Sequence, residues 1–522
     1  MKITYNRVKL LSLIANLFVV FMAQGQATIY PVPEGLQASP DYKVFVNGKE
    51  VFVYASPVPA AYCSFELHGN VQVTIKASRD IKWVDVRPYS AGVKPVFKDS
   101  TITFSLSKPL QLSVELNGTL KTPLFLFANP PEKNKPSKET PNVLFFEAGK
   151  IHYPGIIYLK SNQQVYIEGG AVVVGVIKAT REKNIKVSGY GVLDGSYNNR
   201  FDDALIKEKK IENLPITGAG YYQRFLEFND CENVQVENIT LHNGTSWQIV
   251  PENCRDVHIN NVKIISDQPS DDGIDIVHSK NVVVENCFIR TKDDCIAIKA
   301  YIKKGTGPRI DSVLVQAPAT FKKFNTDLIQ DVDSILIRDC VMWNALWGNA
   351  LEIGFELNGV DVKNISFTNC DIIHVEAGAV LSIHNAGTST VSNVLFDNIR
   401  IEDARHKLID FAIFRSRYSE DGVEDETEMR KQYLNGAWDG VLAVPAEKKQ
   451  YHAQFRGHIQ DIVLNNIQIT GGIFPYSILC GSDEAHAVEN ITISGMQVYG
   501  KRIEAIEKLR MYVEHSKKIQ VR

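Results

Sequence analysis

Apolar and polar residues alternate in a short unit that recurs along most of the chain. The unit reads Asn-Val-x-Val-x-Asn-Ile/Cys-x-Ile, and its period of two and its β-branched residues predict a strand rather than a helix. Clear copies begin at Asn233, Asp256, Asn281, Ser334, Asn364, Asn393, Asp461 and Asn490, and a looser copy begins at Asn184. Most successive copies begin 23 to 30 residues apart. A period of this length predicts a solenoid, because one repeat cannot bury its apolar face without its neighbours.

The solenoid predicted for residues 143–522 is a right-handed parallel β-helix. Leucine-rich repeats have a similar period, but the Leu frame that they need is missing from this sequence. The second Asn of the unit tolerates a left-handed turn and can hydrogen-bond its neighbours, which predicts an Asn ladder at one corner. These corner residues are Asn238, Asn261, Asn286, Asn369, Asn398 and Asn466. Two longer steps predict insertions near 301–332 and 404–457, which would wall a cleft.

The region before the repeats has a different pattern. Residues 28–131 contain short alternating strands, and Asn47-Gly48 marks a hairpin turn within one of them. Many short strands with regularly spaced turns predict a small antiparallel β-sandwich. Residues 132–142 are polar and include Pro and Lys, which is typical of a linker. Residues 1–25 combine basic residues, a short apolar stretch and small residues, which predicts a cleaved signal peptide and a secreted or periplasmic protein.

Composition narrows the possible partners. The chain has 522 residues, 44% hydrophobic and 22% charged, so it can bury a large core. Its net charge of −3 gives no electrostatic reason to expect nucleic acid as a partner. We expect no membrane span, no cofactor, no metal site and a monomer. Some of the eight cysteines take the place of Ile or Val in the repeat, and the others leave disulfides possible.

Two acidic clusters interrupt the repeat and suggest chemistry. Asp272 and Asp294 are 22 residues apart, and Ile274 and Ile296 align under the same shift, so we expect both carboxylates in one cleft on adjacent coils about 4.8 Å apart. Asp293 would point to the opposite face unless the backbone turns there. Clustered carboxylates raise at least one pKa, which leaves an acid beside ionised bases. The alternative is that these residues bind Ca²⁺ or cap turns.

The motifs Gln268-Pro269-Ser270-Asp271-Asp272-Gly273-Ile274-Asp275 and Thr291-Lys292-Asp293-Asp294-Cys295-Ile296-Ala297-Ile298-Lys299 resemble those of glycoside hydrolase family 28, the polygalacturonases. That family has a right-handed parallel β-helix and inverts the anomeric configuration. The resemblance implies a hydrolase of α-glycosidic bonds in a polysaccharide or its oligosaccharides. It also implies that Asp293 is the general acid and that Asp272 and Asp294 position and activate water.

The sequence departs from the family where the substrate's carboxylate is held. Asn349 stands at the His of the family's Gly-His-Gly motif, and Ser382-Ile383-His384 replaces its Arg-Ile-Lys motif. Losing the Arg and the Lys removes charge-assisted hydrogen bonds to a sugar acid, which favours a neutral or differently decorated glycan. The chain is also similar, more loosely, to glycoside hydrolase family 49, the dextranases and isopullulanases, which join a β-sandwich to a β-helix.

Five further residues are candidates for substrate binding. They are Lys299, Trp347, Asn349, Glu352 and His384. Each has a structural alternative, such as neutralising the acidic cluster, packing at a corner or occupying a solvated loop. Trp343 is a weaker candidate for stacking on sugar rings. Two functions other than hydrolysis also stay open. One is a polysaccharide lyase, which needs a neutralised uronate and a basic proton acceptor, and the other is a non-catalytic carbohydrate-binding solenoid.

Overall fold

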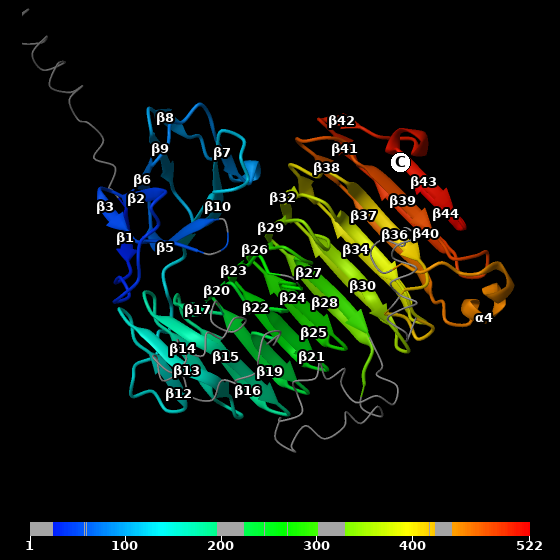
Figure 1. Ribbon diagram of the computed structural model, residues 1–522, viewed down its shortest axis with the longest axis horizontal. Helices are drawn as coiled ribbons and strands as arrows, with labels where there is room; N and C mark the ends of the chain where they lie inside the picture. The colour runs from blue at the N-terminus through cyan, green and yellow to red at the C-terminus, as the bar shows by residue number, and fades with distance from the viewer. Residues whose placement is uncertain are drawn as a thin grey trace, which may run out of the picture.

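The computed structural model describes residues 25–522 except 57, 59, 196–223, 245, 269, 301–328, 417 and 423–440. The expected signal peptide, apart from its last residue, lies outside the described residues. So do most of the first expected insertion and the middle of the second. In the described part of the chain, almost all regular secondary structure is strand, and the strands form two sheets followed by a long parallel β-helix (Figure 1). The predicted fold class is therefore confirmed.

The N-terminal region consists of two packed sheets. The first contains β1 (Gln26–Ile29), β4 (Val53–Tyr54), β5 (Ala61–His68), β7 (Val84–Arg87), β10 (Leu110–Leu116) and β11 (Leu124–Asn129). The second contains β2 (Tyr42–Val46), β3 (Lys49–Val51), β6 (Val71–Ala77), β8 (Val96–Lys98) and β9 (Thr101–Leu106). Alternate side chains of both sheets form one buried core. One pair departs from the antiparallel prediction, because β5 and β11 run parallel.

Each coil of the β-helix contributes strands to three rows. The outer row contains β12 (Val143–Phe146), β14 (Gln164–Ile167), β16 (Lys183–Ser188), β19 (Glu232–Glu237), β22 (Arg255–Asn260), β25 (Lys280–Glu285), β28 (Val332–Arg338), β31 (Val362–Thr368), β34 (Thr390–Asp397), β37 (His458–Asn465), β40 (Val488–Ser494) and β44 (Ser516–Val521). The row beside the sandwich, here called the sandwich row, contains β17 (Val192–Asp194), β20 (Thr240–His242), β23 (Lys263–Ile265), β26 (Phe288–Thr291), β29 (Val341–Asn344), β32 (Asp371–Val375), β35 (Arg400–Ile401), β38 (Gln468–Ile469) and β41 (Gln497–Val498).

The third row carries the acidic motifs and is here called the site row. It contains β18 (Leu226–Asn229), β21 (Ile249–Glu252), β24 (Ile274–Val277), β27 (Ile296–Ala300), β30 (Leu351–Leu357), β33 (Ala379–Asn385), β36 (Lys407–Ile413), β39 (Tyr476–Cys480) and β43 (Met511–Glu514). The remaining elements are β13 (Ile151–Tyr158), β15 (Val172–Thr180), β42 (Lys501–Arg502), α4 (Lys449–Ala453) and the 3-10 helices η1 (Tyr89–Ala91), η4 (Ala446–Lys448) and η5 (Ile506–Leu509). No helix in the described part of the chain has the length and apolar character to cross a bilayer.

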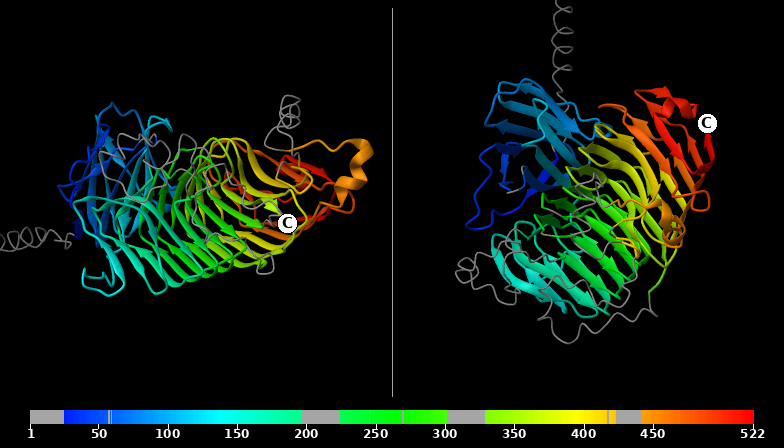
Figure 2. Two further views of the ribbon diagram at one scale, coloured as in Figure 1. Left: turned by 60° about the horizontal axis from the view of Figure 1, so that its bottom comes forward. Right: turned by 45° about the vertical axis from the view of Figure 1, so that its right-hand side comes forward.

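Apolar side chains stack inside the coils because successive strands pair in register. On the site row, Ile274 lies opposite Ile296, then Leu351 and then Leu381, and all four are fully buried. Figure 2 shows these coils stacked along one axis. A residue's place in one coil therefore predicts which residues lie above and below it.

The corner Asn ladder predicted from the repeat is present. Asn261 Nδ2 donates to Asn238 Oδ1 at 2.9 Å, and a second ladder joins Asn233 Nδ2 to Asn184 Oδ1 at 2.8 Å. The corner residues Asn238, Asn261, Asn286, Asn369, Asn398 and Asn466 have φ between 53° and 70°. Asn tolerates this left-handed conformation better than most residues, which explains why it recurs at the corner. All eight cysteines are free thiols, so none of the possible disulfides is formed.

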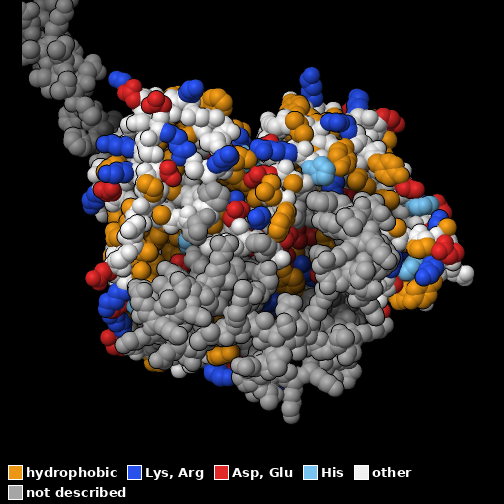
Figure 3. Space-filling view, in the orientation of Figure 1, with side chains coloured by type: hydrophobic (Ala, Val, Ile, Leu, Met, Phe, Trp, Pro, Cys, Tyr) orange, Lys and Arg blue, Asp and Glu red, His pale blue; other side chains and the backbone are white. Residues whose placement is uncertain are grey.

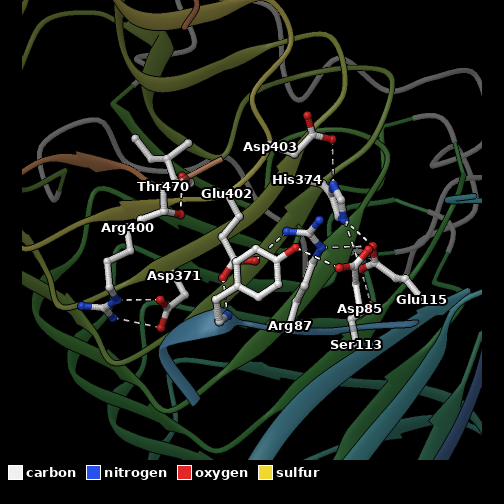
Figure 4. A network of polar contacts seen from close by, with 12 residues as sticks. Asp85, Arg87, Ser113, Glu115, Asp371, His374, Arg400, Glu402, Asp403 and Thr470 are labelled. Atoms are coloured by element: carbon white, nitrogen blue, oxygen red, sulfur yellow. Dashed lines mark hydrogen bonds and ion pairs between the residues drawn. The ribbon is translucent and has the colours of Figure 1, made fainter. Parts of the chain in front are cut away.

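The sandwich packs against the sandwich row of the β-helix. Its Phe125 ring lies 4.8 Å from the Phe288 ring and 5.8 Å from the Trp343 ring, measured between centroids. A buried polar network continues this interface toward the C-terminal coils (Figure 4). In it, Glu115 lies 3.0 Å from the His374 ring, and Arg87 lies 2.7 Å from Glu402. These contacts fix one edge of the sandwich beside coils that follow the acidic motifs.

Candidate active site

The backbone turns where the second acidic motif begins. Strand β26 ends at Thr291 and β27 begins at Ile296, so Asp293 and Asp294 lie in the turn between the sandwich row and the site row. The Thr291 hydroxyl donates to the Asp293 carbonyl at 2.8 Å and helps to close this turn. The alternation of a regular strand therefore does not separate Asp293 from its neighbour.

Asp272 and Asp294 occupy matching positions on adjacent coils. The Gly273 N–H donates to the Asp294 carbonyl at 2.8 Å, and Ile274 lies opposite Ile296 just beyond them. Both carboxylates are buried. The 22-residue shift seen in the sequence thus corresponds to one coil of the β-helix.

Asp271 has a structural place in the same turn. Its Oδ1 accepts the N–H groups of Lys292 and Asp293, each at 2.9 Å, and its Oδ2 accepts the Gln268 N–H at 2.9 Å. Its side chain is fully buried. Asp271 therefore holds the two acidic motifs against each other rather than facing a substrate.

Lys299 is the cation at the centre of the cluster. Its Nζ lies 3.3 Å from Asp272 Oδ2, 3.3 Å from Asp275 Oδ1 and 3.6 Å from Glu356 Oε2. It also lies 4.2 Å from the centre of the Trp247 ring. Burial alone would lower the pKa of Lys299, but Glu356, Asp272 and Asp275 raise it well above the ordinary value. Lys299 is therefore charged and stabilises the ionised form of Asp272.

The three aspartates cannot all be ionised at neutral pH. Burial raises the pKa of Asp293 to about 8, and the charges of Asp272 and Asp271 add to this rise. Burial raises the pKa of Asp294 well above its ordinary value, with further contributions from Asp272 and Asp293. Burial also raises the pKa of Asp272, but the Lys299 charge opposes it. The cluster thus combines retained protons with one carboxylate supported by a cation, as general acid and base catalysis requires.

A hydrogen-bonded chain continues from Asp294 along the site row. Asn349 donates its backbone N–H to Asp294 Oδ1 at 2.6 Å, and its side-chain amide donates to Glu352 Oε2 at 2.9 Å. Glu352 lies 3.0 Å from His384 Nδ1, and Asp410 lies 3.1 Å from His384 Nε2. Burial alone would lower the pKa of His384, but Glu352 and Asp410 raise it to about 10. His384 is therefore an imidazolium between two carboxylates.

The structure brings the sequence candidates together, with one exception. Lys299, Asn349, Glu352 and His384 extend from the aspartates along the site row. Trp347 lies in the next turn, 47% exposed, with its ring 4.8 Å from Lys292 Nζ. Trp343 was wrongly offered as a sugar-stacking residue. It is fully buried against the sandwich because its strand belongs to the sandwich row, and its Nε1 donates to Glu376 at 2.9 Å.

Two residues of this site were missed in the sequence. Asp410 lies at the far end of the hydrogen-bonded chain, and Trp247 lies against Lys299. A signal for Asp410 exists, because Ile409-Asp410-Phe411 repeats the apolar, acidic, apolar pattern of Leu351-Glu352-Ile353, and the two acids occupy the same column of the site row. Within the described ranges, no three His, Cys, Asp or Glu side chains are arranged to hold a metal ion.

The segment that carries the acidic motifs is similar to a known protein family. The model of the family named Glycosyl hydrolases family 28 matches residues 151–320. The resemblance read from the acidic motifs is confirmed. The match includes both acidic motifs and Lys299.

Curated relatives also match parts of the chain. A polygalacturonase of Juniperus ashei is 24% identical over 234 residues, which are 44% of this chain and 39% of the relative. Polygalacturonase QRT2 of Arabidopsis thaliana is 33% identical over 118 residues, which are 22% of this chain and 25% of the relative. The chain thus spans well under half the length of these relatives.

A solved structure shares the whole architecture. Dex49A of Penicillium minioluteum, a family 49 dextranase, superposes with a TM-score of 0.61 at 14% sequence identity. The match covers 93% of this chain and 96% of Dex49A. This likeness shows that the β-sandwich and the β-helix form a fold that another protein also has. The looser similarity to family 49 is thus confirmed at the level of fold.

Proposed function

We propose that the protein is a glycoside hydrolase that cleaves α-glycosidic bonds of a polysaccharide or its oligosaccharides with inversion. The observation that carries this proposal is the clustering of the buried Asp272 and Asp294 with the partly buried Asp293 beside Lys299, within the segment that matches family 28. The features of residues 1–25 support secretion or export to the periplasm.

In this mechanism Asp293 and Asp272 have opposite tasks. Asp293, whose pKa is about 8, donates its proton to the glycosidic oxygen as the bond to the anomeric carbon breaks. A water molecule attacks the anomeric carbon from the opposite face and gives a proton to Asp272, whose ionised form is stabilised by Lys299. Asp294 orients this water and is itself held by Asn349. The leaving sugar departs as an alcohol, and solvent restores both protonation states.

The charges on the site row favour a neutral glycan over a polyuronate. Four cations on and beside it are already engaged by carboxylates: Arg224 with Glu252, Lys299 with Asp272, Asp275 and Glu356, His384 with Glu352 and Asp410, and Lys407 with Asp410. A fifth cation, Lys292 in the turn before Asp293, lies over the Trp347 ring instead. A uronate would enter a site with excess negative charge and would have to compete for these cations. We therefore propose a neutral α-linked glycan, with dextran-type α-glucans as the first candidates.

A panel of polysaccharides tests this function. The purified protein is incubated with polygalacturonate, dextran, pullulan and algal galactans, and new reducing ends and ultraviolet absorbance are measured. The proposal expects reducing ends from a neutral glycan, no unsaturated product, and an inverted first product in proton NMR. An unsaturated end would indicate a lyase, retention would exclude this mechanism, and binding without cleavage of any glycan would indicate a binding protein.

A further inference from the structure

The edge strand of the sandwich exposes two large aromatic rings at fixed positions. Trp83, just before β7, is 51% exposed, and Tyr89, just after it, is 45% exposed. Both side chains donate a hydrogen bond to the Asp85 carboxylate. Trp83 Nε1 donates to Asp85 Oδ2 at 3.3 Å, and the Tyr89 hydroxyl donates to Asp85 Oδ1 at 3.0 Å. One carboxylate therefore orients both rings.

Other contacts fix these rings further. The Arg87 guanidinium lies 4.5 Å from the centre of the Tyr89 ring, and the Tyr89 N–H donates to Glu402 of the β-helix at 2.5 Å. The Trp83 ring lies over Gly118, where a Cβ atom would come within 2.7 Å of the indole. Such fixed rings lose little conformational entropy when a ligand covers them.

This edge faces a notch between the sandwich and the C-terminal coils. Figure 3 shows the surface hollowed there, and in Figure 1 strand β7 faces β38 and β41 across it. Above Glu402, the next two coils present Thr470 and Tyr499, whose N–H groups donate to Ile401 and Ile469 carbonyls at 2.8 Å each. Tyr499 is 51% exposed. Tyr499 therefore adds an exposed aromatic side chain two coils beyond Glu402, and its hydroxyl donates to the Gly472 carbonyl at 2.9 Å.

The notch lies beside the same turn region as the aspartates. Glu402 follows β35, and β35 is three coils beyond β26, whose turn carries Asp293 and Asp294. Coils are about 4.8 Å apart, so the Tyr89 contact lies roughly 14 Å along the axis from that turn. A long glycan held by the aspartates could therefore extend toward the notch, whereas a short one could not.

We propose that Trp83, Asp85 and Tyr89 form a second binding surface for a neutral polysaccharide chain, separate from the aspartate cluster. Flat rings offer an apolar face to the C–H face of a pyranose, and the Asp85 carboxylate accepts hydrogen bonds from its hydroxyls. Arg87 is engaged by Glu115 and Glu402, and Arg405 by Asp403, whereas Lys82 beside Trp83 is exposed. The Asp85 carboxylate between the two rings opposes an anionic glycan at this point.

Affinity gel electrophoresis tests this surface without depending on catalysis. The full chain carries Asp293→Asn to prevent cleavage, and its migration is measured in gels that contain dextran, pullulan or polygalacturonate. The test variant adds Trp83→Ala and Tyr89→Ala, and the control adds Tyr158→Ala, which removes an aromatic ring that is 54% exposed on β13. Thermal denaturation checks that each variant is folded.

The proposal expects dextran or pullulan to retard the Asp293→Asn protein and the Tyr158→Ala control equally. The Trp83→Ala/Tyr89→Ala variant should bind the same glycan roughly tenfold more weakly, a change of about 1.4 kcal/mol. Three results would overturn the second surface. The double variant is retarded as strongly as its parent, only polygalacturonate retards the Asp293→Asn protein, or neither neutral glycan retards the Asp293→Asn protein. None of these results depends on turnover, so the hydrolase proposal is tested separately.

Discussion

The side-chain amide of Asn349 lies between Asp294 and Glu352, with Nδ2 3.3 Å from Asp294 Oδ1 and 2.9 Å from Glu352 Oε2. This contact joins the aspartate cluster to the ionic chain of Glu352, His384 and Asp410. Asn349 thus orients a neighbouring carboxylate. Asn349 serves the site mainly by positioning Asp294.

Replacing Asn349 by Ala tests this positioning role. The substitution removes the amide contact to Asp294 and leaves the backbone N–H of residue 349 as the donor, so the carboxylate is held less firmly. The kcat should fall by roughly tenfold to a hundredfold because small displacements of reacting groups are costly. KM should change little, since the amide is already engaged by protein groups. Steady-state kinetics on the glycan identified by the panel measure both constants. A large rise in KM with unchanged kcat would instead mean that Asn349 binds substrate.

Lys299→Met should shift the pH dependence of activity. The Lys299 charge opposes the rise in the Asp272 pKa that burial causes, so its removal raises that pKa further. The acidic limb of the kcat/KM profile should move to higher pH, and the rate near neutrality should fall. Profiles from pH 4 to pH 9 measure the shift. An acidic limb at an unchanged pH would show that Lys299 does not set the state of the base.

His384 should make stability depend on pH in the alkaline range. Its pKa rises from about 6.5 unfolded to about 10 folded, because Glu352 and Asp410 outweigh burial. A raised pKa stabilises the fold fully below the unfolded pKa, and this contribution is lost as pH rises through the folded pKa. The Tm should therefore fall between pH 7 and pH 10.

The matched variant is His384→Gln. It should have a lower Tm at pH 6, because the buried Glu352 loses its charged partner and Asp410 keeps only Lys407, a change that can cost about 3–5 kcal/mol. Its Tm should also fall less steeply than that of the parent between pH 7 and pH 10. If the Tm of the variant and the Tm of the parent fall equally steeply with pH, His384 is not held as an imidazolium.

The repeat made the fold and the central pair of aspartates predictable. The 22-residue shift relates Asp272 to Asp294 because one coil of a β-helix places residues with the same offset above each other.

The rest of the site depends on contacts that the repeat does not encode. Asp410 reaches His384 from the next coil, and Trp247 meets Lys299 from an earlier one. The docking of the sandwich depends on pairs such as Glu115 and His374, which are 259 residues apart in the sequence. No local pattern specifies such a pair, so Trp343 could be assigned to the interface only from the structure.

Replacing Asp293 by Asn is the most direct test of the central claim, that clustered aspartates on adjacent coils hydrolyse a glycan. Asn is close in size to Asp but cannot donate a proton as an acid, so kcat on the panel's substrate should fall by roughly 10²–10⁴-fold while the Tm is preserved. In the parent, kcat/KM should be lost as pH rises through about 8, where Asp293 gives up its proton. Full activity of the folded Asp293→Asn protein would contradict this account.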